Sequence, residues 1–275
     1  MEPIEAVLLG VVQGLTEFLP ISSSGHLVLF QSLLGLREPA VLFDIFLHVG
    51  TLVAVCAVFF NDIRAILLSL LRLPALWAAA GGLRRLYADN TDVRMAVLIV
   101  IGTLPTVVLG LAFKEIAERL FSSVGIVGCM LVITGSLLWV TRRTPPQGRS
   151  LSMMTVRDAL LIGFVQGLAI TPGISRSGAT ISIALLIGVQ RELAGRYSFL
   201  LSLPAICGAL LLGLDSSAFQ NTVPATTILV GTAAAAVVGY LALLALLRLV
   251  RKGHLYRFAP YCWVVGLTAL ALSLT

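Results

Sequence analysis

Six apolar stretches, each at least 17 residues long, restrict the fold of this 275-residue chain more than any other feature. A membrane's hydrocarbon core is about 30 Å thick, and a helix of about 20 apolar residues crosses it. Such segments must be helical, because lipid offers no hydrogen-bond partner to an unpaired backbone group. Only 12% of the residues are charged, against about 25% in soluble domains. We therefore predict an all-α integral membrane protein. The six predicted transmembrane helices are residues 43–60, 93–113, 124–141, 197–213, 226–247 and 258–275.

Two further apolar regions, 4–35 and 158–190, are interrupted near their middles by Pro, Gly and Ser. The interruptions read PISSSG at 20–25 and PGISRSG at 172–178. Each half is too short to cross a membrane, and Pro and Gly break helices. We therefore predict two re-entrant helix-turn-helix pairs that return to the side they entered.

The distribution of Lys and Arg gives an orientation, because cytoplasmic loops hold an excess of these residues. With the N-terminus outside and both split regions re-entrant, fifteen of the 19 basic residues are cytoplasmic. Three lie outside, and Arg176 lies within the second split region. Both termini are then extracytoplasmic. The basic residues form no single stripe, so the net charge of +6 does not indicate a nucleic-acid partner.

The chain also contains an internal repeat. Residues 10–28 and 163–181, offset by 153, are identical at nine of 19 positions. The two copies enter the membrane from opposite sides, so the repeat is inverted, and such repeats place their site near the membrane midplane. We predict a single membrane domain, 1–275. It comprises repeat 1 at about 1–141, a cytoplasmic linker at 142–157 and repeat 2 at about 155–275.

Both breaks have a composition suited to an anion. A new apolar helix is expected near Ser24 and another near Ser177, and unpaired N–H groups at helix starts favour negative charge. Ser and Gly also serve as caps and turns, but their duplication favours binding of a phosphate or diphosphate. Arg176 strengthens this interpretation, because a charge within the membrane is usually functional and a guanidinium matches phosphate oxygens. An ion pair with Glu17 or Asp44 that only locks the bundle is the alternative.

Further polar side chains accompany the first break. Glu17 and Gln13 share a helix face and could hold Mg²⁺ or Ca²⁺ through oxygen, or Glu17 could act as a base or simply pair with Arg176. Ser23 is a candidate nucleophile, and His26 a candidate base or proton donor.

Three other polar residues are candidates for supporting roles. Asp44 and His48 share a face of the next helix and could hold the site residues in position, although placement at a helix start would explain Asp44 equally well. Gln166, the repeat mate of Gln13, could do the same or bond between helices.

At these residues the sequence resembles the undecaprenyl-diphosphate phosphatase family of the bacitracin-resistance type. That family has a (Glu/Gln)-xxx-Glu motif followed by a Ser-rich stretch ending in Gly-His, here QGLTE at 13–17 and PISSSGH at 20–26. A distant Pro-Gly-x-Ser-Arg-Ser-x-x-Thr motif matches PGISRSGAT at 172–180. The match spans both halves of the chain.

The resemblance implies hydrolysis of undecaprenyl diphosphate to undecaprenyl phosphate and inorganic phosphate, which recycles the lipid carrier of peptidoglycan synthesis. It also implies dependence on Mg²⁺ or Ca²⁺ and a site that opens outside the inner membrane. Glu17 would bind metal or activate the attacking group, Ser23 would attack, His26 would assist proton transfer and Arg176 would hold phosphate. Gln13 stands where many members have Glu. The residues expected around the phosphate are Ser22, Ser24, Gly173, Ser175, Arg176, Ser177 and Thr180.

Two other functions are compatible with part of the sequence. A transporter or flippase of a phosphorylated lipid would use the same midplane site, since broken inverted repeats are a transporter architecture. The other large membrane lipid-phosphatase superfamily is disfavoured, because no histidine lies between Arg176 and His254 to serve as its nucleophile. Beyond membrane lipid and a polyprenyl diphosphate, the sequence leaves a homodimer open as a partner.

Overall fold

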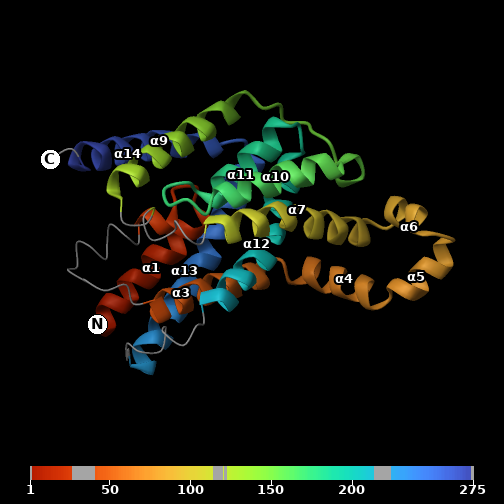
Figure 1. The fold of residues 1–275 in the computed structure, drawn as a ribbon, viewed down its shortest axis with the longest axis horizontal. Helices are drawn as coiled ribbons and strands as arrows, with labels where there is room; N and C mark the ends of the chain where they lie inside the picture. Colours follow the sequence, from red (N-terminus) through yellow and green to blue (C-terminus); the bar gives the residue numbers. More distant parts are fainter. Residues whose placement is uncertain (1, 27–40, 114–119, 121–122, 214–223, 274–275) are drawn as a thin grey trace.

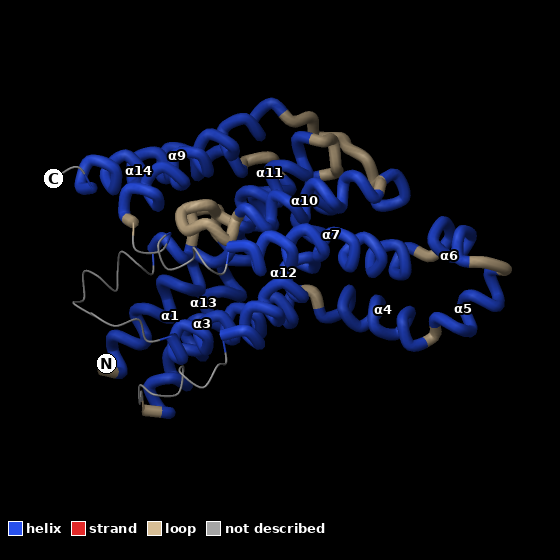
Figure 2. Tube along the Cα trace, in the orientation of Figure 1, coloured by secondary structure: helices blue, strands red, loops and turns tan. Residues whose placement is uncertain are grey.

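The computed structural model describes residues 2–26, 41–113, 120, 123–213 and 224–273. This part of the chain is built of helices joined by short loops (Figures 1 and 2). One isolated bridge, between Arg149 and Val189, is the β-type pairing among the described residues. The α-helices are α1 (Pro3–Phe18), α3 (Val41–Val58), α4 (Phe60–Leu71), α5 (Leu73–Ala80), α6 (Leu83–Asp89), α7 (Thr91–Phe113), α9 (Val124–Val140), α10 (Val156–Leu168), α11 (Arg176–Leu186), α12 (Arg191–Gly213), α13 (Ala225–Arg251) and α14 (Ala259–Ser273).

Five segments are long and apolar enough to cross a membrane, and they contain α7, α9, α12, α13 and α14. A sixth is obtained if α3 and α4, which meet at a bend of 80°, are one broken span. Large apolar side chains such as Val100, Val108 and Val264 remain exposed on the outer faces of these helices. A soluble protein would bury such a surface, whereas lipid solvates it. The prediction of an all-helical, multi-pass membrane protein is confirmed.

Several predicted helices have different bounds in the structure, and two of them show the physical reasons. The helix predicted at 197–213 begins at Arg191, because its first turns are polar and lie outside the apolar stretch that revealed it. The helix predicted at 43–60 ends at Val58, where α4 turns away. Hydropathy detects the apolar length of a segment but not a bend within it.

The two short helices that follow the linker match the predicted helix–turn–helix of the second split region. α10 has 13 residues and α11 has 11, each shorter than the roughly 20 residues that a membrane crossing needs. In the first split region α1 ends at Phe18, and residues 23–26 are again helical. The rest of that predicted pair, 27–40, lies outside the described residues.

The long helices pack lengthwise against one another. α13 packs along both α1 and α3, whereas α7 packs along α10 and α12, and α9 lies against α14. Figure 1 shows α1, α3 and α13 side by side, with α9 and α14 together on the other side of α10 and α11. The two breaks therefore lie between these groups of helices, in the middle of the molecule.

Glycines bring the paired helices into backbone contact. A Cβ at Gly10 of α1 would lie 2.9 Å from the Ala234 Cβ of α13. Where α10 packs on α7, a Cβ at Gly163 of α10 would lie 2.6 Å from the carbonyl carbon of Gly102 in α7. Real side chains almost never approach so closely, so neither position can accept a larger residue without separating the helices. Small residues have this role in many membrane helix interfaces.

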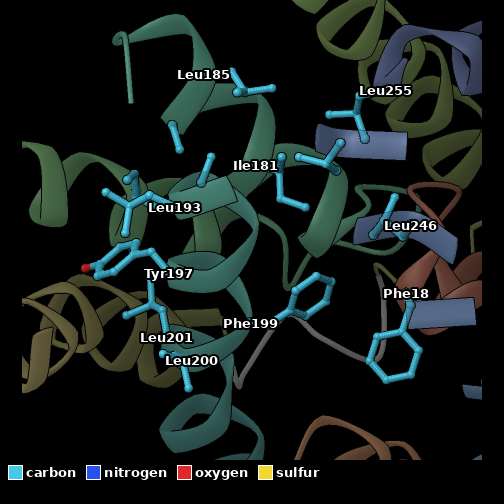
Figure 3. Close-up of a cluster of buried hydrophobic side chains, with 14 of the residues drawn as sticks. Phe18, Ile181, Leu185, Leu193, Tyr197, Phe199, Leu200, Leu201, Leu246 and Leu255 are labelled. Carbon is cyan, nitrogen blue, oxygen red and sulfur yellow. The ribbon is translucent and has the colours of Figure 1, made fainter. Parts of the chain in front are cut away.

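The hydrophobic core is mostly aliphatic, and aromatic side chains of α1 and α12 meet within it (Figure 3). The rings of Phe18 and Phe199 meet edge to face with centroids 5.8 Å apart, and Phe59 lies 6.1 Å from Phe199 on another side. Tyr197 is fully buried, and its hydroxyl donates to the Leu98 carbonyl oxygen at 2.8 Å. These contacts tie the C-terminal end of α1 to α12 and to the junction of α3 and α4, which fixes the position of the residues that follow Phe18.

The linker before α10 is held by one bidentate ion pair. Arg149 donates to both carboxylate oxygens of Asp158 at 2.8 and 2.9 Å and also to the Ile187 carbonyl oxygen at 2.8 Å. Asp158 further accepts from the Thr155 amide at 2.7 Å in a capping box. Burial raises the pKa of the Asp158 carboxyl, but the bonds from Arg149 and Thr155 outweigh burial, so this pKa lies below its usual value.

We predict that Asp158→Asn destabilises the protein by about 1–2 kcal/mol at pH 7, because it removes a charge-assisted pair and weakens a helix cap. A carboxyl whose pKa is lowered by folding stabilises the protein above its unfolded pKa of about 3.9 and loses that effect as pH falls through the folded pKa. The difference in Tm between wild type and variant in detergent should therefore shrink below about pH 4. Asp89→Asn is the control, because Asp89 is exposed and makes no hydrogen bond to a described residue. A Tm difference independent of pH would contradict this role of the charge.

Candidate active site at the two helix breaks

Direct hydrogen bonds join the two breaks. The amide of Gly173, in the second break, donates to the Ser22 hydroxyl of the first break at 3.1 Å. In the other direction, Ser177 donates to the Phe18 carbonyl oxygen at 2.8 Å. Loops more than 150 residues apart in the sequence thus form one structural unit, visible as adjoining loops in the middle of Figure 2.

The second break is also anchored to α9. Thr134 donates through its hydroxyl to the Gly173 carbonyl oxygen at 3.0 Å and accepts from the Ser175 amide at 3.2 Å. Gly173 has a φ of 95°, which side chains rarely tolerate. A Cβ there would also lie 2.7 Å from the Met130 Cβ. Glycine is therefore required at this turn by both conformation and space.

The first break contains a backbone conformation that is rare for its residue type. Ser22 has a φ of 72°, the one positive φ of a non-glycine residue among those described. Such a conformation costs about 1–3 kcal/mol and persists only where the surroundings enforce it. The hydrogen bond from the Gly173 amide to the Ser22 hydroxyl is one such constraint. The next residue, Ser23, then points its hydroxyl towards Glu17 of α1.

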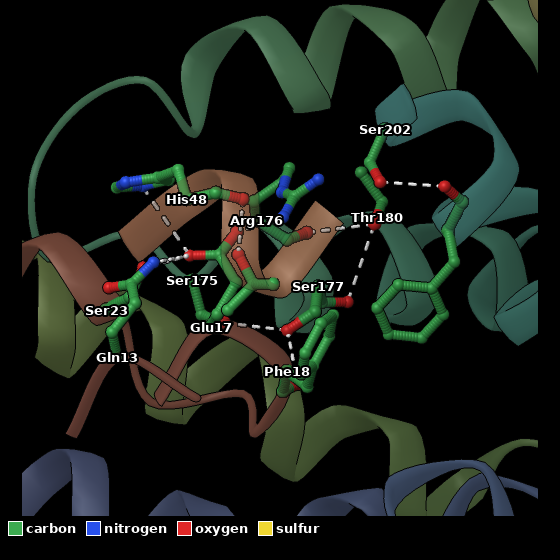
Figure 4. A network of polar contacts seen from close by, with 12 residues as sticks. Gln13, Glu17, Phe18, Ser23, His48, Ser175, Arg176, Ser177, Thr180 and Ser202 are labelled. Atoms are coloured by element: carbon green, nitrogen blue, oxygen red, sulfur yellow. Dashed lines mark hydrogen bonds and ion pairs between the residues drawn. The ribbon is translucent and has the colours of Figure 1, made fainter. Parts of the chain in front are cut away.

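Glu17, near the C-terminal end of α1, is the centre of the polar network (Figure 4). It forms an ion pair with Arg176, the first residue of α11. Its other oxygen accepts from the Ser23 hydroxyl at 2.7 Å and from the Gln13 side-chain amide at 3.1 Å. His48 Nε2 of α3 lies 3.8 Å from that same oxygen. Side chains from four separate segments therefore converge on one carboxylate.

This network contains unused bonding capacity at two buried atoms. Arg176 Nη1 and Gln13 Oε1 have no hydrogen-bond partner among the described residues. A buried polar atom without a partner costs about 1–3 kcal/mol, so a ligand that supplies the partner is favoured. The guanidinium nitrogen suits an anionic oxygen, and the amide oxygen suits a donor or a cation.

Three residues hold His48 and His26 in place. The Asp44 carbonyl oxygen lies 2.9 Å from His48 Nδ1, which directs the other ring nitrogen to Glu17. His26 lies 2.8 Å from the Ser22 carbonyl oxygen through Nδ1 and 2.6 Å from the Tyr261 hydroxyl of α14 through Nε2. The Ser23 hydroxyl therefore contacts Glu17, whereas the hydrogen bonds of His26 are made to Ser22 and Tyr261.

The remaining serine and threonine candidates bond mainly within the breaks. Ser175 is the N-cap of α11 and accepts from the Gly178 amide at 3.1 Å. Thr180 donates to the Arg176 carbonyl oxygen at 2.9 Å, and the hydroxyls of Ser24 and Ser22 lie 3.4 Å apart. These contacts shape the loops around Arg176.

Gln166, the repeat mate of Gln13, lies in a different environment. Its amide donates to the Thr106 hydroxyl of α7 at 3.2 Å and to the Leu201 carbonyl oxygen of α12 at 3.3 Å. It thus forms the bond between helices that the sequence left open as its alternative role.

The residues present could contribute to a metal site only in part. Among the described residues, no three His, Cys, Asp or Glu side chains come together. The Glu17 carboxylate and the oxygen of the Gln13 amide, whose nitrogen donates to Glu17, nevertheless provide two oxygen ligands from one helix. Mg²⁺ is often bound by one or two protein oxygens together with substrate phosphates, so these two residues fit a metal that arrives with, or is completed by, a phosphate ligand.

Thr134 and Tyr261 are the site residues that sequence reasoning missed. Both lie in apolar helices far from either motif, and their hydroxyls become meaningful only when the helices are assembled. A threonine inside a 17-residue apolar helix was the one available signal for Thr134, but such residues usually bond to their own helix.

We predict that Thr134→Val lowers the stability of the protein by about 1–3 kcal/mol, because the Gly173 carbonyl and the Ser175 amide lose a buried partner. Thermal unfolding in detergent measures the effect. Thr134→Ser keeps the hydroxyl and serves as the matched control. Equal Tm values for the two variants would show that the hydroxyl does not support the break.

The sequence of this chain is similar to proteins of one family. The family described as Bacitracin resistance protein BacA matches residues 6–268. The undecaprenyl-diphosphatase of Desulforapulum autotrophicum is 52% identical over 270 residues, which cover 98% of each chain. That of Desulfatibacillum aliphaticivorans is 52% identical over 276 residues and 99% of each chain, and that of Desulfosudis oleivorans is 49% identical over 268 residues and 97% of each. The chain therefore belongs to the bacitracin resistance protein BacA family.

Proposed function

We propose that this protein is a membrane phosphatase that hydrolyses undecaprenyl diphosphate to undecaprenyl phosphate and inorganic phosphate. The relatives named undecaprenyl-diphosphatase align with nearly the whole chain. The observation that carries the proposal is the convergence of Ser23, Glu17 and Arg176 where the two breaks meet. Hydrolysis of a phosphoanhydride needs a nucleophile, a proton acceptor and positive charge on the transferred group, and these three residues supply them.

Arg176 is the proposed phosphate-binding residue. One guanidinium nitrogen is held by Glu17, whereas Nη1 is buried and without a partner among the described residues. A phosphate oxygen at Nη1 would satisfy it and would be close to Ser23, because both residues contact the same carboxylate. Charge that develops on the transferred phosphoryl group is then neutralised in a site with little water.

Ser23 is the proposed nucleophile, with Glu17 as its base. The Ser23 hydroxyl already donates to Glu17 at 2.7 Å, a distance suited to proton transfer. The Ser23 oxygen would attack the terminal phosphorus, the bridging P–O bond would break, and undecaprenyl phosphate would leave. Water would then hydrolyse the phosphoserine and release inorganic phosphate. Direct attack by a water activated by Glu17 is the competing route.

His26 and a metal ion have supporting roles in this proposal. The stacked His26 and Tyr261 rings form a hydrogen-bonded pair that could relay a proton to the departing phosphate. Glu17 and Gln13 would hold Mg²⁺ or Ca²⁺. When bound, such an ion offsets negative charge on the diphosphate. Ser22, Ser24, Gly173, Ser175, Ser177 and Thr180 would surround the phosphate.

An apolar groove beside His26 is the proposed place for the start of the prenyl chain. This groove has a volume of about 360 Å³ and is lined by residues that include Leu15, Leu19, His26, Phe258 and Tyr261. Its walls are almost entirely apolar, as a hydrocarbon ligand requires. Because His26 borders it, a chain in the groove would lead from the first break towards lipid.

We further propose that the two halves form an inverted repeat with re-entrant pairs at α1 and at α10–α11. The corresponding helix pairings of α13 with α1 and of α7 with α10, each through glycines, support this architecture. Both termini lie at one end of the molecule, away from α5 and α6 (Figure 1). Together with the Arg distribution, this supports six crossings, extracytoplasmic termini and a site that opens on the outer side of the inner membrane.

We predict that Arg176→Lys lowers phosphate release from undecaprenyl diphosphate at least about tenfold, since lysine keeps the charge but cannot hold Glu17 and a phosphate oxygen with two fixed nitrogens. Glu17→Gln should lower it about 100-fold or more, because the base is lost. Ser23→Ala should abolish release, and chelation of divalent metal should do so reversibly. The assay uses purified protein in detergent, with Mg²⁺ or Ca²⁺. Arg157→Lys, an exposed arginine of α10, is the control.

The outcomes of this assay separate the competing mechanisms. Substantial release by Ser23→Ala would exclude the phosphoserine and favour direct attack by water. No release by folded wild type with either metal would exclude the phosphatase and favour a transporter or flippase of a phosphorylated lipid.

We also predict that Leu15→Trp raises KM for undecaprenyl diphosphate about three- to tenfold with little change in kcat, because the indole fills part of the groove and weakens binding alone. The KM for a short-chain prenyl diphosphate should change much less. Leu8→Trp is the matched control, since Leu8 lies on the same face of α1, is also exposed and is not part of the groove. An equal effect of both variants would contradict this location of the chain.

A further inference from the structure

A second cavity, which is polar, lies away from the two breaks, where the ends of three helices meet. It has a volume of about 300 Å³ and is formed by the start of α4, the start of α12 and the end of α13. Three guanidinium groups line it, those of Arg191, Arg196 and Arg251. We call this site the arginine cavity.

The three arginines are only partly neutralised. Arg196 forms an ion pair with Asp62, and Arg191 donates to the Thr144 carbonyl oxygen at 3.1 Å. The Nε atoms of Arg191 and Arg196 are buried and have no acceptor among the described residues. The Arg251 side chain forms no hydrogen bond or ion pair with another described residue. Glu192 is the second carboxylate at the cavity, so three positive charges face two negative ones.

Arg191 is held rigidly at the cavity wall. Its guanidinium packs against Gly253, where a Cβ would lie 2.6 Å from Nη1. Gly253 has a φ of 73°, so this turn after α13 requires glycine for conformation as well as for space. A fixed guanidinium loses less freedom when it binds an anion than a mobile one does.

Apolar side chains complete the cavity. Val58, Phe59, Leu247 and Val250 line it beside the arginines. A free inorganic anion gains no stabilisation from contact with apolar side chains, whereas the carbon atoms of a lipid would bury apolar surface against them. The matching ligand therefore carries a phosphate next to an apolar group.

The location of the cavity agrees with a lipid headgroup. Its arginines are among those that the positive-inside rule assigns to the cytoplasmic side. Basic pockets between membrane helices on that side recognise anionic lipid headgroups. We propose that the arginine cavity binds the phosphate headgroup of an anionic phospholipid, at a site separate from that of the proposed phosphatase.

Native mass spectrometry of the full chain in neutral detergent tests this proposal with added phosphatidylglycerol. Arg251→Gln should lower occupancy of the tightest phosphatidylglycerol site about tenfold, because one charge-assisted contact is lost. Arg248→Gln is the matched control on the same helix, exposed and not part of the cavity, and should change occupancy less than about twofold. Glu192→Gln should raise occupancy, since it removes a competing carboxylate.

Three results would overturn the proposal. Arg251→Gln and Arg248→Gln could have equal effects, phosphatidylcholine could bind as well as phosphatidylglycerol, or inorganic phosphate at millimolar concentration could displace the lipid. The last result would assign the cavity to a free anion. Because the readout is lipid binding, these outcomes do not depend on whether the protein is a phosphatase.

Discussion

The ion pair between Glu17 and Arg176 is the interaction on which the arrangement of the two breaks depends. It joins α1 to α11 in the interior, where two charges are costly to remove from water. Loss of one partner of a buried pair typically costs about 3–5 kcal/mol, because the other charge is left uncompensated. Ser23 and Gln13 reduce this cost by donating to the same carboxylate. The groups that stabilise Glu17 are also those suited to phosphate chemistry.

Helices too short to cross a membrane create the second constraint. Where α10 ends and α11 begins, the exposed amides and carbonyls must find partners inside the protein. The structure supplies them from other segments, through the hydroxyls of Ser22 and Thr134. The same hydrogen bonds fix the direction of Arg176, so the polar site follows from satisfying the backbone.

Much of this arrangement could be predicted from the sequence. The apolar stretches indicated the membrane helices, and the duplicated motif identified the two breaks and the residues Glu17, Ser23 and Arg176. These features depend on local composition and spacing. The bend between α3 and α4 could not be predicted, because no proline or glycine marks residues 58–60.

The site residues that escaped prediction were those that act across helices. The contacts of Thr134 with Gly173 and of Tyr261 with His26 join segments far apart in the chain. No spacing rule relates such positions. Gln166 shows the converse, because its resemblance to Gln13 did not reveal that its partners lie on α7 and α12.

The glycine contacts described above have a consequence for movement. At Gly10 and Gly163 helix backbones touch almost directly, with no side chain between them to change rotamer. Closely packed surfaces do not deform gradually, so α1 with α13, and α10 with α7, should each move as a rigid body. Entry of a long lipid would then require displacement between these bodies. The hydrogen bonds that join the two breaks, together with the core around Phe18 and Phe199, would oppose such a displacement and would have to rearrange with it.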